Sequence, residues 1–315
     1  MQPSGISVIV PTIGRPESLR NLLQSLSIQT VKVSEVIVAD GSSTIETEAV
    51  INDPQWRQAG LIIRHLQVQP PNAVRQREAA ICESVGELLL LLDDDVVLEP
   101  DCVEQLAQAM TDGSEVVAVT ADLKNESWSR PTKIWRWYLK YALGLDEDEW
   151  QGRVLGPLLR FGYYIPHSET RAIEWMGAGN SLVSKSAYQR AGGFSDFFLH
   201  RCTMNEDVDI SIKLLRLGTI LFCPKAKLSH FHASSGRLSL SEVAEDDIHN
   251  RFLILHRTVG YNKVKAFKLV LLYYFIETMS DLFGLVRLKA SHNRVKRISG
   301  RSRAMSLIIL KSIHN

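Results

Sequence analysis

The sequence predicts an α/β protein in which a mainly parallel central sheet is flanked by helices and followed by a C-terminal helical extension. Short apolar runs alternate with helix-like patterns over the first 120 residues. Leu88–Leu92 is a run of five leucines, which is typical of a strand buried on both faces. Helical patterns prevail from Ser239 onward. Strands and helices that alternate in this way build a parallel sheet with cover on both faces.

The first elements follow one another as strand, helix and strand. Ile6–Val10 is rich in β-branched residues, and Pro16 opens a segment with leucines at helical spacing. Glu35–Ala39 and Leu61–Leu66 are the second and third strands, and Ala73–Val85 is a helix that leads into the leucine run. These elements predict a nucleotide-binding type of α/β half.

Beyond the leucine run the alternation continues and then becomes less regular. Pro100 begins a helix, and Val116–Thr120 is a strand. Asp207–Leu217 is helical and is closed by Gly218. We therefore expect three parts, which are residues 1–120, residues 121–235, and residues 236–315 with C-terminal helices and a basic tail.

Composition excludes several classes of protein. Hydrophobic residues make up 45% and charged residues 23% of the 315 residues, which excludes a mainly disordered, collagen-like or coiled-coil chain. The net charge of +1 gives no general field for polyanions, so no nucleic acid partner is expected. Residues 287–315 nevertheless hold eight Lys or Arg and no acid, which leaves 28 basic against 35 acidic residues in the rest.

The cysteines and the N-terminus predict a cytoplasmic chain with reduced thiols. Cys82, Cys102, Cys202 and Cys223 form no C-x-x-C pair, so we expect buried free thiols rather than a zinc site or a dithiol redox motif. The first seven residues lack the basic region of a signal peptide. Reduced cysteines are typical of a cytoplasmic location.

Three aspartates, Asp93–Asp95, directly follow the leucine strand. Adjacent buried carboxylates repel one another, so we expect a cation to neutralise them. Side chains alternate in an extended chain, which puts Asp93 and Asp95 on one side and Asp94 on the other. Mg²⁺ or Mn²⁺ bridging a pyrophosphate is the cation that these oxygen ligands predict. The alternative is a solvated acidic turn in which Asp101 caps the following helix.

Other polar residues are expected near these aspartates. Ligands of open α/β sheets bind beyond the carboxyl ends of the strands. Thr12 and Asp40 follow strand ends in the predicted topology, as Asp95 does. One crevice is therefore expected to use all three residues.

A set of motifs follows in a fixed order along the chain. It consists of Ser7–Thr12 with Arg15 and Pro16, Val38–Ser42, Arg77 with Gly86, Leu92–Asp95, Gly177–Asn180, Gly192–Phe194, Asn205–Asp209, and Pro224 with His230. In this order the motifs resemble those of family 2 glycosyltransferases, the inverting, metal-dependent group with the GT-A fold. Glu78 and Ala80 depart from the Asn and Gly that are usual after the family's arginine.

On the donor side, the resemblance implies roles for the matched residues. Asp40 would contact the nucleobase, and Asp95 would bind the metal. His230, with His232 as its rival, would complete the metal's ligands. The implied donor-binding residues are Pro11, Thr12, Arg15, Asp40, Arg77, Asp93 and Asp94.

On the acceptor side, the resemblance implies that Asp207 is the catalytic base. A carboxylate can take the proton of an acceptor hydroxyl, and a helix N-terminus favours its ionised form. The alternative is that Glu206, Asp207 and Asp209 only cap the helix, with Asn205 as the N-cap. The implied acceptor-binding residues are Gly177, Ala178, Gly179, Asn180 and Glu206.

The implied activity is the transfer of one sugar, with inversion, from a nucleotide-diphosphate sugar to a glycan or lipid-linked glycan, as in polysaccharide or cell-envelope glycan synthesis. A metal-dependent nucleotidyltransferase is one alternative. Such an enzyme requires a Gly-rich, basic loop after the first strand, whereas Pro11–Pro16 contains only Gly14 and Arg15. A catalytically silent, glycan-binding relative is the other alternative.

The tryptophans of residues 128–150 would stack on an acceptor, lie at a membrane interface or pack in the core.

The C-terminal region predicts contact with a membrane surface. Ala266–Val286 is long and apolar, but Lys268, Glu277 and Asp281 argue against a transmembrane span. Together with the basic tail, it indicates peripheral attachment to anionic lipid on the cytoplasmic face of a membrane. The alternative is a core helix followed by a disordered, solvated tail.

Overall fold

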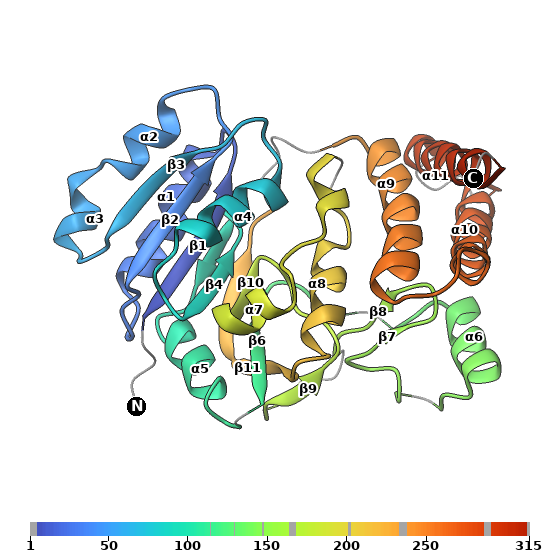
Figure 1. Ribbon diagram of the computed structural model, residues 1–315, viewed down its shortest axis with the longest axis horizontal. Coiled ribbons are helices and arrows are strands. Elements are labelled where there is room, and N and C mark those ends of the chain that lie inside the picture. Colours follow the sequence, from blue (N-terminus) through green and yellow to red (C-terminus); the bar gives the residue numbers. More distant parts are fainter. Residues whose placement is uncertain are drawn as a thin grey trace.

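The computed structural model describes residues 5–313 except 114, 129, 147, 164–167, 201–202, 233–237 and 287–290. A central nine-stranded sheet forms the body of this part of the chain, and helices cover both of its faces (Figure 1). Further helices, drawn in orange and red, pack together at one end. The predicted α/β class with a C-terminal helical extension is confirmed.

The N-terminal half alternates strands and helices as the sequence predicts. Its strands begin and end within a few residues of their predicted bounds. The elements are β1 (Ile6–Thr12), α1 (Pro16–Ser27), β2 (Glu35–Asp40), α2 (Glu46–Ile51), α3 (Pro54–Gln58), β3 (Ile63–Gln67), α4 (Ala73–Glu83), β4 (Leu88–Leu92), β5 (Val96–Leu98), α5 (Cys102–Ala109) and β6 (Val116–Leu123).

The remaining elements are shorter at first and then entirely helical. The middle of the chain forms α6 (Lys133–Leu143), β7 (Val154–Leu155), β8 (Leu159–Arg160), β9 (Arg171–Ile173), β10 (Asn180–Ser184), α7 (Lys185–Arg190), the 3₁₀ helix η1 (Asp196–His200), α8 (Glu206–Leu214) and β11 (Thr219–His230). The end of the chain forms α9 (Leu240–Leu253), the π-helical turn η2 (Ile254–Thr258), α10 (Lys263–Val286) and α11 (Ser291–Ile313).

The sheet is parallel on one side and mixed on the other. Its order is β3-β2-β1-β4-β10-β6-β11-β5, and β9 also pairs with β11. The pairs among β3, β2, β1 and β4 are parallel, as is β6 with β11. Strand β10 runs antiparallel between β4 and β6. The sequence did not predict β10, because its five residues show neither a long apolar run nor a clear alternation.

Alternate residues of the central strands point to opposite faces of the sheet. On one face, Val8 and Leu90 pack beneath α1 and α5. On the other, Ile9 and Leu91 pack beneath α4, α7 and α8. The leucine run is therefore buried on both faces, as expected, and fixes the position of the aspartates that follow it.

The basic C-terminal segment is helical over Ser291–Ile313, so the alternative of a disordered tail is wrong for these residues. Residues Ala304, Met305 and Ile308 of α11 belong to the main core. A Cβ on Gly300 would lie 2.0 Å from the carbonyl oxygen of Ser241, so glycine lets α11 cross α9 closely.

Arginines of α11 are paired with one carboxylate of α10. Arg294, Arg297 and Arg301 lie 2.9, 2.6 and 2.8 Å from the oxygens of Asp281. These pairs fix α11 against α10 and leave fewer basic side chains for a partner than the charge count indicates.

A small separate core joins α6, the β7–β8 hairpin and α10. The ring of Trp135 stacks on Tyr273 with centroids 6.0 Å apart, and its indole N–H donates to Glu277 at 2.9 Å. Trp150 and Phe161 are buried in the same cluster. Two of the clustered tryptophans are therefore core residues.

The cysteines follow the expectation in part. Cys102 and Cys223 are buried free thiols, whereas Cys82 is exposed. The expected burial of Cys82 was wrong because this residue, in the last turn of α4, faces solvent. Cys202 lies outside the described residues.

Candidate active site

The carboxyl ends of β1 and β4 bring Thr12 next to the aspartate run. The Thr12 hydroxyl donates to Asp94 Oδ2 at 2.6 Å, and Arg15 Nη1 donates to Asp94 Oδ1 at 3.0 Å. Burial raises the pKa of Asp94 to about 6, although the Thr12 hydrogen bond and the Arg15 charge oppose the rise. Asp94 is thus held inside the protein by its own neighbours.

Asp93 and Asp95 lie on the other side of the run, together with His230. Their ligand atoms all lie within 4.8 Å of one another. His230 is the last residue of β11 and pairs with Val96 of β5, so the sheet places its ring beside Asp95. The distance from His230 Nε2 to Asp95 Oδ1 is 3.0 Å. Two carboxylates and an imidazole at this spacing suit a divalent cation.

Glu126 contacts both His230 and His232, and these three side chains form a second group that could hold a cation. Glu126 Oε1 is 2.9 Å from His230 Nδ1 and 3.0 Å from His232 Nε2. The side chain of Asn125 also bonds both the backbone N–H and the carbonyl oxygen of His230, at 2.9 and 2.7 Å. In the described residues His230 approaches both Asp95 and Glu126, whereas His232 pairs with Glu126. No motif signalled Glu126 or Asn125.

Arg77 of α4 joins the aspartate run to α8. Its Nη2 donates to Asp93 Oδ1 at 2.6 Å, and its Nη1 approaches Glu206 Oε1 at 3.5 Å. The guanidinium is buried, with a side-chain exposure of 4%. Burial and the neighbouring Asp207 charge raise the pKa of Glu206 above its usual range.

Asp207 lies in the first turn of α8, where its carboxylate has two donors. Its Oδ1 accepts from the Val208 N–H at 2.8 Å, and its Oδ2 pairs with Arg160 of β8. The Arg160 guanidinium lies over the Trp175 ring, 5.5 Å from its centroid. Sequence reasoning missed Arg160 because β8 is a two-residue strand without a motif.

The capping alternative for this segment fits only partly. Asn205 occupies the N-cap position but its side chain forms no cap, and it donates to Asp247 at 2.7 Å instead. Asp209 is fully buried and contacts Ser195, Thr258 and Lys213. Asp209 therefore has a structural environment, whereas Asp207 borders a cavity.

The glycine segment before β10 packs closely against the site. A Cβ on Gly179 would lie 2.2 Å from Asp93 Oδ2, and one on Gly177 would lie 2.0 Å from Asn180 Oδ1. The Asn180 side chain donates to the Ala121 carbonyl oxygen at 2.8 Å. These glycines let the backbone approach the aspartates.

Two cavities meet at these residues. The larger, of about 820 Å³, is lined by the strand ends and α4, including Pro11, Thr12, Arg15, Pro70, Pro71, Asn72, Arg75, Gln76, Asp94 and Asp95. The smaller, of about 330 Å³, is lined by Trp128, Arg160, Tyr163, Trp175, Gly177, Ala178, Gly179, Asn180 and Asp207. Both include Arg77, Asp93, Glu206, His230 and His232.

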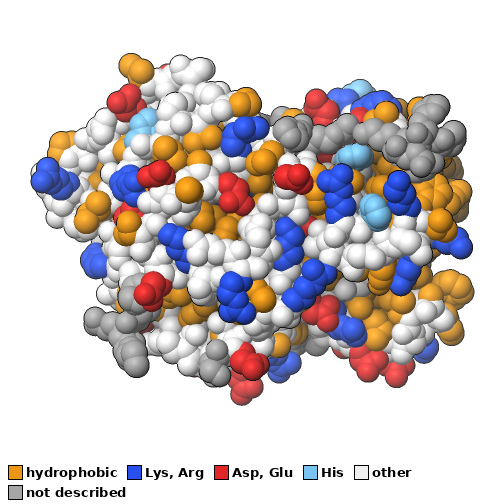
Figure 2. Space-filling view, viewed as in Figure 1, with side chains coloured by type: hydrophobic (Ala, Val, Ile, Leu, Met, Phe, Trp, Pro, Cys, Tyr) orange, Lys and Arg blue, Asp and Glu red, His pale blue; other side chains and the backbone are white. Residues whose placement is uncertain are grey.

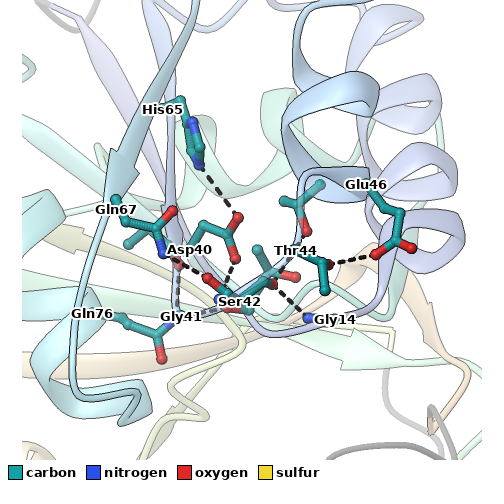
Figure 3. Close-up of polar contacts among 12 residues, drawn as sticks. Gly14, Asp40, Gly41, Ser42, Thr44, Glu46, His65, Gln67 and Gln76 are labelled. Carbon is teal, nitrogen blue, oxygen red and sulfur yellow. Dashed lines mark hydrogen bonds and ion pairs between the residues drawn. The ribbon is translucent and has the colours of Figure 1, made fainter.

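Asp40 is placed differently from the other predicted donor residues. Figure 3 shows it between His65 and the turn at Gly41 and Ser42. It accepts from the Ser42 N–H at 2.7 Å, lies 3.3 Å from His65 Nε2 and is 1% exposed. Asp40 is not among the residues that line the two cavities. The strand register pairs Asp40 with Thr12, although Asp40 does not line the cavity that Thr12 and Asp95 share.

Comparison with known proteins supports the motif resemblance. Residues 7–165 match the family described as Glycosyl transferase family 2, which is half of the chain. The chain belongs to this family. The family 2 match covers β1 to β8 and therefore the whole aspartate run.

Curated relatives of this family 2 chain include glycosyltransferases. An N-acetylglucosaminyltransferase of Mesorhizobium japonicum is 29% identical over 235 residues, which cover 69% of this chain and 50% of the relative. A GalNAc(5)-diNAcBac-PP-undecaprenol beta-1,3-glucosyltransferase of Campylobacter jejuni is 29% identical over 110 residues, which cover 34% of this chain and 35% of the relative. The aligned part thus spans half or less of the length of these relatives.

Solved structures of similar fold share little sequence with the chain. S. aureus TarS 1-349 in complex with UDP-GlcNAc has a TM-score of 0.54 at 15% identity and covers 96% of this chain and 90% of its own. GalNAc-T7 with UDP, GalNAc and Mn²⁺ has a TM-score of 0.61 at 12% identity and covers 99% of this chain and 57% of its own. At these identities the likeness concerns the fold.

Proposed function

We propose that this chain transfers a sugar, with inversion, from a nucleotide-diphosphate sugar to a hydroxyl of a glycan or lipid-linked glycan. The observation that carries the proposal is the junction of the two cavities. A donor in the larger cavity and an acceptor in the smaller one would meet at Asp93, Glu206 and His230. The proposal assigns residues 1–120 to the donor half and residues 121–235 to the acceptor half.

The metal is assigned to Asp95 and His230, with Asp93 beside them. The three groups fit Mn²⁺ or Mg²⁺ because they offer two carboxylate oxygens and one imidazole nitrogen within 4.8 Å of one another. The bound cation would offset the charge of the diphosphate and of the departing nucleotide. The similar structure of GalNAc-T7 holds UDP and Mn²⁺, which supports this choice.

The larger cavity offers further donor-binding groups. Arg15, Arg77 and Arg75 place positive charge along a wall that a diphosphate would occupy. The Nε atoms of Arg75 and Arg77 are buried and have no hydrogen-bond partner within the described residues. Asp94, which accepts from the Thr12 hydroxyl, fixes Arg15 in place, and Pro11 completes the wall. For Asp40 we propose an indirect role, which is to hold the Gly41 turn against Pro71.

The smaller cavity has the character of a sugar site. Trp128 and Trp175 lie edge to face with ring centroids 4.9 Å apart, and Tyr163 lines the same space. Aromatic faces of this kind stack on the apolar faces of sugars. We assign the acceptor to these rings and to Gly177, Ala178, Gly179 and Asn180, with Glu206 in the wall that both cavities share.

The proposed chemistry is one displacement with a balanced proton transfer. Asp207 takes the proton of the acceptor hydroxyl, whose oxygen bonds to the anomeric carbon as the bond from that carbon to the diphosphate oxygen breaks. The products are the elongated glycan and a nucleoside diphosphate. Arg160 pairs with Asp207 and orients the Asp207 carboxylate toward the acceptor hydroxyl.

We also propose a peripheral location on the cytoplasmic face of a membrane. The Campylobacter relative is named for an undecaprenol-linked substrate, which supports a lipid-linked acceptor here. Residues Lys263–Val286 form a helix that is long and apolar enough to cross a membrane by length and composition. The charged residues Glu277 and Asp281 make contacts inside the protein, which favours surface attachment.

Product analysis tests this function. The chain is incubated with a panel of nucleotide sugars and Mn²⁺, and nucleotides are separated by chromatography. Release of a nucleoside diphosphate with formation of a glycoside supports the proposal. Release of pyrophosphate would show a nucleotidyltransferase instead, and the absence of any turnover with every donor would leave the glycan-binding alternative.

A further inference from the structure

Two helices at one end of the molecule expose large apolar side chains next to each other. Helices α6 and α10 are in contact because Trp135 stacks on Tyr273 and donates to Glu277. Away from this contact, their exposed apolar residues form what we call the α6–α10 face. Its members are Ile134, Trp137, Tyr141, Phe275, Met279, Leu282, Phe283 and Val286. Figure 2 shows hydrophobic side chains gathered at this end of the molecule.

The spacing of these residues gives one apolar row on each helix. On α6 the row is Ile134, Trp137 and Tyr141, at intervals of three and four residues. On α10 it runs from Phe275 to Val286 with the same intervals. Trp137 is 63% exposed and Val286 is 83% exposed. Large apolar groups gathered on a surface mark a site of contact with a protein or a membrane.

Basic residues lie beside the apolar row of α6. Lys133, Arg136 and Lys140 each come one position before a member of that row. One position turns about 100° around a helix, so the basic side chains form a second row next to the apolar one. Helix α6 carries no acid, and these three residues take part in no ion pair among the described residues. The Lys140 ammonium lies 5.9 Å from the centroid of the Tyr141 ring, and all three basic side chains are exposed, so an anionic partner would meet accessible positive charge.

Helix α10 also exposes basic side chains, while its acidic side chains make contacts inside the protein. Lys265 and Lys268, on its earlier turns, are exposed. The acids Glu277 and Asp281 instead contact Trp135 and the arginines of α11. Asp281 is therefore buried behind the row from Phe275 to Val286, and Glu277 is directed to Trp135 and Arg301 with 28% of its side chain exposed.

We propose that the α6–α10 face lies on the surface of an anionic membrane. Its aromatic and aliphatic side chains enter the boundary of headgroups and acyl chains, and the lysines and arginines contact lipid phosphates. The observed pairing of Arg294, Arg297 and Arg301 with Asp281 makes α11 a support for α10 rather than the anchor itself.

The face is connected to the candidate active site. The inner side of α6 packs on the β7–β8 hairpin, and β8 carries Arg160 beside Asp207. A membrane under α6 would thus lie near the acceptor cavity. This part of the inference rests on the proposed transfer to a lipid-linked acceptor, whereas the membrane contact does not.

Vesicle binding tests the inference. The full chain is mixed with vesicles of phosphatidylcholine and phosphatidylglycerol, or of phosphatidylcholine alone, without donor or acceptor, and sedimented. Binding is expected with the anionic vesicles. The double variant F275S/F283S should weaken binding to the anionic vesicles by about tenfold or more, because it removes two aromatic rings that would be buried in the membrane. The control I45S/I62S removes two side chains that are 78% and 64% exposed at the other end of the molecule, and should bind normally.

A second readout reports depth and position. Brominated lipids should quench the tryptophan fluorescence of the full chain, and W137F should lose most of that quenching. Equal sedimentation of F275S/F283S and the unmodified chain, with W137F still fully quenched, would overturn the proposal.

Two further experimental results would contradict a surface contact with the membrane and would indicate either a spanning helix or a second copy of the chain. Resistance of the bound protein to alkaline carbonate would indicate that α10 spans the bilayer. A dimer in vesicle-free solution that F275S/F283S dissociates would indicate that a second copy covers the face. Because no donor or acceptor is present, a failure here leaves the proposed transferase activity standing, and lost turnover with intact binding contradicts only that activity.

Discussion

Glu206 and Asp207 are neighbours at the start of α8, yet their carboxylates have different surroundings. Glu206 faces Arg77 in the wall that both cavities share, where burial raises its pKa. Asp207 accepts from the Val208 N–H and from Arg160. Two neighbouring carboxylates with such different surroundings are expected to have different roles in catalysis. We therefore assign proton abstraction to Asp207 and acceptor contact to Glu206.

The first prediction concerns Asp207. The variant Asp207→Asn keeps the shape of the side chain and loses the base, so turnover should fall by about 10²- to 10⁴-fold. Donor affinity measured by calorimetry should change little, because Asp207 lines only the acceptor cavity of the two. Near-normal turnover would transfer the role of base to Glu206, since Asp209 is fully buried and engaged.

The second prediction concerns Glu126, which we interpret as a positioning residue. A metal-binding histidine usually donates its other ring N–H to a carboxylate, which fixes the ring and its tautomer. Glu126 lies 2.9 Å from His230 Nδ1 while Nε2 faces Asp95. Glu126→Gln should therefore weaken Mn²⁺ binding by about 10- to 100-fold, measured by electron paramagnetic resonance without donor.

The matched variant for Glu126→Gln is His232→Gln. His232 contacts Glu126 but is not in the group of Asp93, Asp95 and His230. Its replacement should leave Mn²⁺ affinity within a few-fold of the unmodified chain. If His232→Gln loses the metal and Glu126→Gln keeps it, the ligand is His232 and the assignment of His230 is wrong.

At the scale of elements, one buried carboxylate ties together three strands and the turn before β4. Glu35 of β2 accepts from the Ser7 hydroxyl of β1 at 2.6 Å, from the Val85 N–H at 2.8 Å and from Arg64 of β3 at 3.1 Å. Burial alone would raise the pKa of Glu35, but these three donors outweigh it and lower the pKa below its ordinary value. The ionised carboxylate is therefore part of the fold's stability.

The third prediction is a pH-dependent loss of stability in Glu35→Gln. At neutral pH the variant should lose about 1.5 to 3 kcal/mol of unfolding free energy, as expected for hydrogen bonds to a charged group. The folded pKa is depressed, so this contribution is present above the ordinary value of 4.5 and disappears as the pH falls through the lower folded pKa. Urea unfolding at pH 7 and at acid pH measures the difference.

Glu83 provides the control for this measurement. It pairs with the same Arg64 at 3.0 Å, but its side chain is 54% exposed. Glu83→Gln should cost no more than about 0.5 to 1 kcal/mol at any pH, because solvent screens exposed pairs. Two results would contradict the role given to Glu35. One is an equal loss of unfolding free energy in Glu35→Gln and Glu83→Gln, and the other is a difference between the two losses that grows at acid pH.

For the whole molecule, the parts predicted from sequence are those with local signals. The strands that lead to Thr12 and to the aspartate run, and the helix that starts at Pro16, follow from residue type and spacing alone. The separation of Asp94 from Asp93 and Asp95 also follows from the alternation of an extended chain. Local patterns therefore place the central part of the candidate site.

The remainder depends on contacts between distant segments. The insertion of β10 between β4 and β6 decides which residues border Asp93, and no local pattern encodes it. Arg160 reaches Asp207 across 47 positions of the chain. The basic residues after Arg287 indicated a tail because their partner, Asp281, lies on another helix. Charge counts and motifs cannot show such pairing.

The central claim is that the larger cavity binds a nucleotide-diphosphate sugar through a cation held at Asp95. Isothermal titration calorimetry of the full chain with the donor selected by product analysis, in Mn²⁺ and in EDTA, tests it most directly. We predict clear binding with Mn²⁺, little binding in EDTA, and loss of the metal effect in Asp95→Ala, because the diphosphate and the aspartates repel each other without a cation. Equally tight binding in EDTA, with Asp95→Ala unchanged, would contradict the claim.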